Sequence, residues 1–209
     1  MADPQFDQYE YVAVIIPGAA LLLGLGVEWP QYLHLGSDKE LSVGDLGLFL
    51  VAAYLAGQLV QALAEIFDRL FWATTGGMPT DWVLQDKHHL ISTDQRTSLQ
   101  TRVHTKFGAN SHLGKIPRVE WYPITRQMYA AVSAAQHATR IDAFNRTYGL
   151  MRGIAVAFLI LTVVYWIVDP GRAWLGAGAL ILAGLAMLRF YLFGKDYARE
   201  LFVQFLALS

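Results

Sequence analysis

Cysteine is absent from this chain of 209 residues. Its absence excludes disulfides, thiolate metal sites and thiol-based redox chemistry. Histidine is absent from the long apolar stretches, which argues against a haem held by two histidines among membrane helices. Sustained alternation of apolar and polar residues is also missing, so no segment predicts a regular β-strand. The architecture must therefore come from helices.

Four charge-free apolar stretches dominate the sequence: 11–27, 46–64, 153–168 and 173–188. A helix needs about 20 mostly apolar residues to cross a bilayer. Each stretch reaches that length with its flanks, because Arg152 and Arg189 can extend their stems and keep their charges at the membrane surface. We predict an all-α membrane protein with four transmembrane helices, long cytoplasmic extensions of helices 2 and 3, and a small helical cytoplasmic module.

Basic residues are distributed unevenly between the loops. Lys39 lies in the first loop and Arg172 in the last turn, whereas every other Lys and Arg lies in 69–152 or after residue 188. Since basic loops stay on the cytoplasmic side, we expect a bacterial inner-membrane protein with both termini in the cytoplasm. The expected division is transmembrane helices 1 and 2 with an outer loop at 28–45 (1–68), the cytoplasmic module (69–152), and helices 3 and 4 with an amphipathic C-terminal tail (153–209).

Three features outside the apolar stretches leave alternatives open. Ser92 or Thr93 can cap a short helix that runs through about Phe107. Trp82 and Trp121 can anchor at the lipid surface, pack in a core or line a ligand pocket, and we favour the first two roles. The tail after residue 194 can continue the fourth helix or lie along the membrane.

Polar side chains recur along one side of the expected second helix, at spacings of three and four: Gln58, Gln61, Glu65 and Arg69. A polar stripe that enters a membrane must face protein or water. These residues can line a pore, or they can form a hydrogen-bonded seam between helices in which Glu65 and Arg69 pair. We favour the seam and keep the pore open.

Pro17 and Gly18 lie near the centre of the first apolar stretch. A proline in a membrane helix frees a backbone carbonyl, which a neighbouring helix or a Ser or Thr must satisfy. The pair can therefore serve as a hinge or gate, or it can be a packing irregularity of a kind that membrane helices tolerate.

The third helix is expected to run unbroken from Pro123 to the turn at Asp169. Its first half carries apolar residues at a mean spacing close to the coiled-coil repeat of about 3.5. They predict a face that packs against the second helix or against another copy of the chain: Ile124, Met128, Ile141, Phe144 and Tyr148.

Catalytic signatures are missing. The sequence has no nucleophile elbow, P-loop or dinucleotide-binding glycine pattern. A zinc site built from His88, His104 and His112 is conceivable, but their spacing matches no familiar ligand pattern. We expect no enzyme activity, no metal and no cofactor.

Two stretches carry a resemblance to known proteins. Residues 57–80 (GQLVQALAEIFDRLFWATTGGMPT) and 140–153 (RIDAFNRTYGLMRG) resemble uncharacterised bacterial four-pass membrane proteins of the kind found as accessory or effector components of antiviral defence. The Arg–His motif of nuclease-like members of such systems is missing. The resemblance implies a membrane role and transfers no catalytic residue.

The expected function is an oligomeric inner-membrane effector or pore subunit, engaged through its cytoplasmic module. The alternative is a non-conducting anchor or sensor that docks a soluble partner, a nucleotide or RNA. The expected partners are the lipid bilayer, further copies of the chain and a soluble cytoplasmic protein. The many basic residues of 69–152 reflect either the rule that basic loops stay on the cytoplasmic side or a role in nucleic-acid binding. We favour the first explanation.

Topology can be tested with reporter fusions. A reporter placed after residue 209 or within 108–111 should read cytoplasmic, and one placed within 36–39 should read periplasmic, because the basic segments are retained inside. The readout is a pair of reporters that are each active on one side of the membrane only. The opposite pattern would overturn the orientation drawn from the basic residues.

Overall fold

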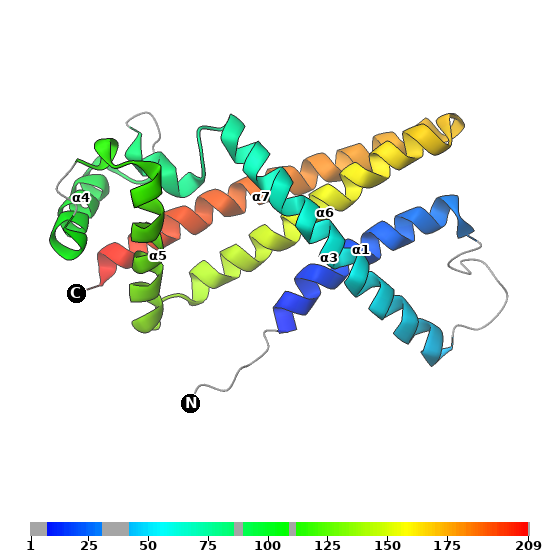
Figure 1. Ribbon diagram of the computed structural model, residues 1–209, viewed down its shortest axis with the longest axis horizontal. Helices are drawn as coiled ribbons and strands as arrows, with labels where there is room; N and C mark the ends of the chain where they lie inside the picture. The colour runs from blue at the N-terminus through cyan, green and yellow to red at the C-terminus, as the bar shows by residue number, and fades with distance from the viewer. Residues whose placement is uncertain (1–7, 31–41, 86–89, 109–111, 209) are drawn as a thin grey trace. The chain divides into compact units, whose positions relative to one another are not determined.

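The computed structural model describes residues 8–30, 42–85, 90–108 and 112–208 (Figure 1). Within these ranges the regular structure is helical, with no β-strand. The α-helices are α1 (Gln8–Glu28), α3 (Val43–Thr74), α4 (Thr93–Phe107), α5 (Arg118–Ala134), α6 (Thr139–Val168) and α7 (Ala173–Ala207). Three 3-10 helices connect them: η1 (Pro79–Leu84), η2 (Leu113–Lys115) and η3 (Pro170–Arg172). The all-α prediction is confirmed for the described residues.

Four candidate membrane spans lie in this set, and they contain α1, α3, α6 and α7. These helices are long and apolar enough to cross a membrane by length and composition. The prediction of four such helices is therefore confirmed.

The chain divides into two compact units. Unit 1 comprises Met1–Arg69 and Arg146–Phe190, and unit 2 comprises Leu70–Asn145 and Tyr191–Ser209. Helices α3, α6 and α7 contribute residues to both units. The C-terminal tail, which the sequence analysis groups with the last transmembrane helix, belongs to unit 2 together with most of the predicted module.

In unit 1, α1 and α3 cross at very short range (Figure 1). A Cβ atom on Gly18 would lie 1.9 Å from the carbonyl oxygen of Ala53, and one on Gly57 would lie 2.0 Å from the carbonyl oxygen of Val14. Neither position has room for a side chain. Small residues allow this approach of two helix backbones, which is how helices gain van der Waals contact where lipid supplies no hydrophobic drive.

Helix α6 packs against both α1 and α7 in unit 1. The hydroxyl of Tyr165 donates to the carbonyl of Gly24 in α1 at 2.8 Å. Leu161 and Ala179 are buried with Tyr165 in one apolar cluster. The turn into α7 is closed by Asp169, whose side chain accepts a hydrogen bond from the Gly171 N–H at 3.0 Å. The helices α6 and α7 thus form a hairpin with a short connection, residues 169–172.

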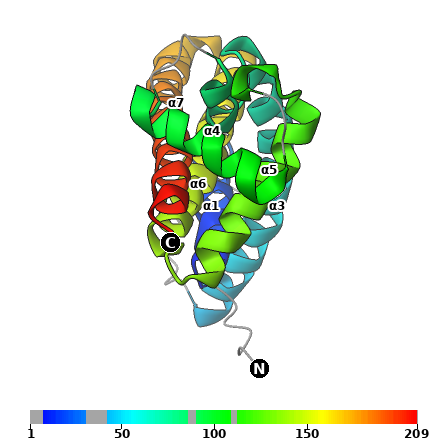
Figure 2. The same cartoon turned by 90° about the vertical axis from the view of Figure 1, so that its left-hand side faces the viewer.

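In unit 2, the last turns of α7 contribute to the core, and Figure 2 shows α4 crossing in front of them. Leu201, Phe202 and Phe205 are almost fully buried. The ring of Phe202 lies 6.1 Å from that of Trp121 in α5. Arg102 of α4 donates to the carbonyl of Phe205 at 3.1 Å, and so satisfies an acceptor that the helix end leaves open. The tail therefore continues the fourth long helix.

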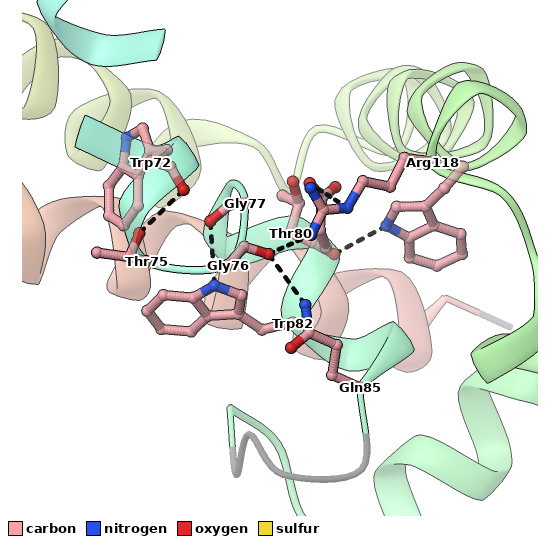
Figure 3. A network of polar contacts seen from close by, with 10 residues as sticks. Trp72, Thr75, Gly76, Gly77, Thr80, Trp82, Gln85 and Arg118 are labelled. Carbon is pink, nitrogen blue, oxygen red and sulfur yellow. Dashed lines mark hydrogen bonds and ion pairs between the residues drawn. The ribbon is translucent and has the colours of Figure 1, made fainter. Parts of the chain in front are cut away.

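The segment after α3 is held by indole hydrogen bonds to the main chain (Figure 3). Trp82 donates from Nε1 to the carbonyl of Gly77 at 3.1 Å, and Trp121 donates from Nε1 to the carbonyl of Thr80 at 2.8 Å. Both indoles are buried, at 4% and 0% exposure. Buried tryptophans with satisfied N–H groups are core residues. Of the three roles left open for them, core packing is the one observed.

Helix α4 has the limits that its sequence predicts. Ser92 accepts from the Gln95 N–H at 3.2 Å, while the Gln95 side chain accepts from the Ser92 N–H at 3.0 Å, which makes a capping box. The helix ends at Phe107, and Gly108 follows with a left-handed φ of 66°. The expected start at Ser92 or Thr93 and the expected end at Phe107 are confirmed.

The expected unbroken third helix is wrong. Helix α5 ends at Ala134 and α6 begins at Thr139. Gln136 lies between them with a left-handed φ of 62°, and the His137 N–H donates to the Val132 carbonyl at 3.0 Å. This bond is the closing interaction of a Schellman-type helix end, a position that glycine usually occupies. Since neither glycine nor proline marks the break, the composition does not reveal it.

The two helices remain linked across the break. The hydroxyl of Tyr129 donates to Asp142 Oδ1 at 2.6 Å. This hydrogen bond, with smaller contributions from burial and from the charge of Asp142, raises the pKa of Tyr129 to about 12. Met128 and Ile141, assigned to the packing face, are fully buried by the chain's own residues, whereas Ile124 and Phe144 are partly exposed.

The break between α5 and α6 can be tested by the effect of a glycine at position 136 on the free energy of unfolding. Gln136→Gly should raise the free energy of unfolding by about 0.5–1 kcal/mol, because glycine adopts a left-handed backbone without steric cost. In an unbroken helix the same change would lower it by about 1 kcal/mol. Ala130→Gly, in the middle of α5, serves as the control that loses stability in either case. Thermal or denaturant unfolding of the three proteins gives the sign, and a loss for Gln136→Gly would contradict the break.

Candidate functional site

The candidate site begins at the proline of α1. Pro17 lies inside the helix and has no N–H, so the Ala13 carbonyl loses its helical donor. The Gln61 side chain of α3 replaces it, since Nε2 donates to the Ala13 oxygen at 3.0 Å. The expectation that a neighbouring helix satisfies this carbonyl is confirmed.

Helix α6 packs against Pro17 and Gln61 through Gly153. A Cβ atom on Gly153 would lie 2.8 Å from Gln61 Nε2 and 2.8 Å from Pro17 Cγ. The missing side chain at position 153 therefore leaves room for the glutamine amide. Three helices meet where one proline, one glutamine and one glycine fit together, and each of the three residues depends on the other two.

A buried ion pair extends the site. Arg152 of α6 donates from Nη2 to Gln61 Oε1 at 3.2 Å, and its Nη1 lies 3.5 Å from Asp68 Oδ2. The Tyr148 hydroxyl donates to the other carboxylate oxygen of Asp68. The side chains of Arg152 and Asp68 are only 17% and 15% exposed. We call Gln61, Asp68, Tyr148 and Arg152, with the Ala13 carbonyl, the polar network.

The electrostatics of the polar network explain why its members depend on one another. Taking a single charge out of water costs several kcal/mol, and only a well-placed partner offsets this. Asp68 has one oxygen toward the guanidinium and the other toward a hydroxyl, so both are engaged. Arg152 Nε is buried without a hydrogen bond to a described residue. Ionisable groups at such positions in membrane helices are candidates for function.

The predicted polar stripe divides into two faces. Gln61 joins the polar network, whereas Gln58, Glu65 and Arg69 are exposed. Gln61 and Asp68 are seven residues apart, which is nearly two full helical turns, so they share a face. The three other residues lie rotated toward the outer side of α3.

Sequence reasoning missed the ion pair. The polar stripe predicted on the second helix does not include Asp68. Arg152 is predicted only to lie at the membrane surface, and Tyr148 only to belong to a packing face. The available signals were the seven-residue spacing from Gln61 to Asp68 and the four-residue spacing from Tyr148 to Arg152, each of which places two polar groups on one helix face.

The predicted hinge residues have a packing role in this arrangement. Pro17 and Gly18 are buried, and α1 continues through both. Gly18 touches the backbone of α3, and Pro17 lies beside Gly153. The hinge role of Pro17 and Gly18 stays a prediction.

Of the conceivable zinc ligands, His88 lies outside the described residues, and His104 and His112 are exposed. Among the residues searched, which are those the structure describes, no group of three His, Asp or Glu side chains could hold a metal ion.

No family model matches the chain, and neither a curated protein nor a solved structure matches it. The roles of its residues can therefore come only from the geometry of the chain itself.

The ion pair can be tested with a double-mutant cycle. Asp68→Asn and Arg152→Gln should each lower the free energy of unfolding by about 1–3 kcal/mol, because each leaves a mostly buried charge without its partner. The double variant should lose clearly less than the sum, since it leaves neither charge behind. The measurement is denaturant unfolding in detergent, followed by circular dichroism.

Glu65→Gln is the matched control, because it removes an exposed carboxylate three residues from Asp68 on the same helix. Its effect should stay within about 0.5 kcal/mol. Strict additivity of the two single variants would show that Asp68 and Arg152 do not interact.

Proposed function

We propose that this chain is a non-conducting membrane anchor and sensor, in which unit 1 is a packed helical scaffold and unit 2 docks a soluble ligand or partner. The observation that carries the proposal is the polar network. Gln61, the central residue of the expected pore stripe, uses both its amide nitrogen and its amide oxygen within the chain.

Conduction would require the opposite arrangement. A water-filled path through a membrane needs polar groups that turn toward it, or a ring of charges. In unit 1 the polar atoms of Gln61 and Asp68 turn toward α1 and α6. Beside them, the backbones of α1 and α3 are in contact at Gly18 and Gly57. These contacts support a seam that holds helices together.

Unit 2 carries the features of a docking module. Its core combines aromatic residues of α5 and α7 with buried aliphatic residues of α4 and α5, so it buries apolar surface within the chain. Its outer residues include exposed polar and basic side chains of α4 and η2. With both termini in the cytoplasm of a bacterial inner membrane, as proposed from the basic residues, unit 2 would meet cytoplasmic ligands.

A second candidate function is an oligomeric pore or effector subunit, and one observation favours it. Gln58 and Glu65 are exposed on a face of α3 whose neighbours Leu55, Leu59 and Ile66 are 59%, 70% and 58% exposed. A carboxylate on an apolar surface is costly in lipid. Further copies of the chain could cover this face, and a ring of Glu65 would favour cations. A role in antiviral defence, which the resemblance implies, would belong with this candidate.

The two candidates differ in whether water reaches Gln58. The chain has no cysteine, so a single Gln58→Cys substitution can be labelled without any background. We expect a charged, membrane-impermeant maleimide to leave Gln58→Cys unlabelled in liposomes, because this position would face lipid or protein. Val119→Cys, at an 85% exposed position of unit 2, should be labelled in molecules whose unit 2 faces outward.

Ion flux through the same liposomes completes the test. The unaltered chain should pass no more potassium than empty liposomes do. Rapid labelling of Gln58→Cys together with potassium flux that Glu65→Gln reduces would reject the anchor and support the pore.

A further inference from the structure

Unit 2 contains a cavity of about 400 Å³. It lies between one face of α4 and the short helix η2, and its lining residues are Thr93, Arg96, Thr97, Gln100, His112, Gly114 and Lys115. Its volume is within the range of small-molecule sites, which is about 300–1,000 Å³. The described lining residues differ from those of most such sites, because they supply hydroxyl, amide and basic groups and include no large apolar side chain.

The charges around the cavity have one sign. Among the described residues that line it, Arg96 and Lys115 are cationic and none is a carboxylate. Arg96 is held in place, since its Nε donates to the Val83 carbonyl at 2.8 Å. This bond orients the planar guanidinium before any ligand arrives. A preorganised guanidinium loses less conformational entropy when it binds an anion.

Neutral hydrogen-bond donors lie beside these cationic groups. Gln100 Nε2 and His112 Nδ1 are 2.7 Å apart. An amide that donates to Nδ1 leaves the ring proton on Nε2, so the imidazole offers a donor of its own. The Thr93 side chain supplies a further hydroxyl at the cavity wall. Donors from α4 and from η2 thus converge on one space.

The start of α4 does not account for this site. Its first N–H groups face the capping box of Ser92 and Gln95, so the Gln95 N–H is already bonded. An anion in the cavity would therefore be held by side chains of the first two turns of α4 and by Lys115 of η2.

We infer that this cavity binds a phosphate monoester group. Phosphate offers several acceptor oxygens to converging donors, and its negative charge complements the positive charges of Lys115 and Arg96. None of the described lining residues is Phe, Tyr or Trp, so these residues offer a nucleotide base no such ring on which to stack. The phosphate is the part recognised. The inference rests on the proposed function, and it names the chemical class of ligand that unit 2 senses.

Such a group can come from a soluble phosphorylated molecule or from a lipid headgroup. The test uses the full chain in nanodiscs of phosphatidylcholine, titrated calorimetrically with inorganic phosphate and with AMP at constant ionic strength set by chloride. We expect saturable binding. Lys115→Gln should weaken it at least about tenfold, because a charge-assisted hydrogen bond is lost, and Lys115→Glu should abolish it.

Lys106→Gln is the matched control, because Lys106 lies on α4 but does not line the cavity. Its affinity should stay within about twofold of the unaltered chain, since only charges at the site contact the ligand. Nanodiscs that contain phosphatidic acid distinguish the two sources. If the headgroup occupies the cavity, the apparent affinity for inorganic phosphate falls in the unaltered chain and does not fall in Lys115→Glu.

Two results would overturn the inference. One is equal binding by Lys115→Gln and Lys106→Gln in proteins with unchanged thermal unfolding. The other is no saturable binding of phosphate or AMP in neutral nanodiscs together with no effect of phosphatidic acid on the unfolding temperature. Either result leaves the anchor proposal intact, because that proposal is decided separately by ion flux and by labelling of Gln58→Cys.

Discussion

The hydrogen bond from Gln61 to the Ala13 carbonyl is the constraint on which the packing of unit 1 depends. Pro17 leaves that carbonyl without its helical donor, and a carbonyl left unpaired in an apolar environment costs several kcal/mol. One amide from α3 satisfies it. The amide can reach only because Gly18 and Gly57 let α1 and α3 touch, and because Gly153 leaves space on α6.

The ion pair between Asp68 and Arg152 extends this set of hydrogen bonds along α3 and α6. Once the Gln61 amide nitrogen is committed to α1, its oxygen is available to the Arg152 guanidinium, which also faces Asp68. Each group satisfies the next, so no member can be replaced without stranding a polar atom or a charge. A network of this kind specifies one register of three helices, because sliding any one of them by a turn would separate it from its partners in the network.

Unit 2 is organised by aromatic packing around the end of α7. Phe202 and Phe205 are buried there, and Arg102 caps the carbonyls that the helix end leaves open. The same helix contributes its earlier turns to unit 1. Its composition changes along its length from small and aliphatic residues to aromatic and charged ones, which fits contact with helices at the start and a mixed core with polar surroundings at the end.

The sequence by itself determined the features that depend on local chemistry. The apolar stretches specify four long helices, Ser92 and Gly108 delimit α4, and Pro17 requires a partner for a carbonyl. Tertiary structure decided which side chain supplies that partner, that Asp68 meets Arg152, and that the C-terminal tail enters a core. The break at Gln136 also needed the structure, because the residue has no turn signature. Periodicity and capping act over a few residues, whereas a pairing across 84 positions depends on how distant helices meet.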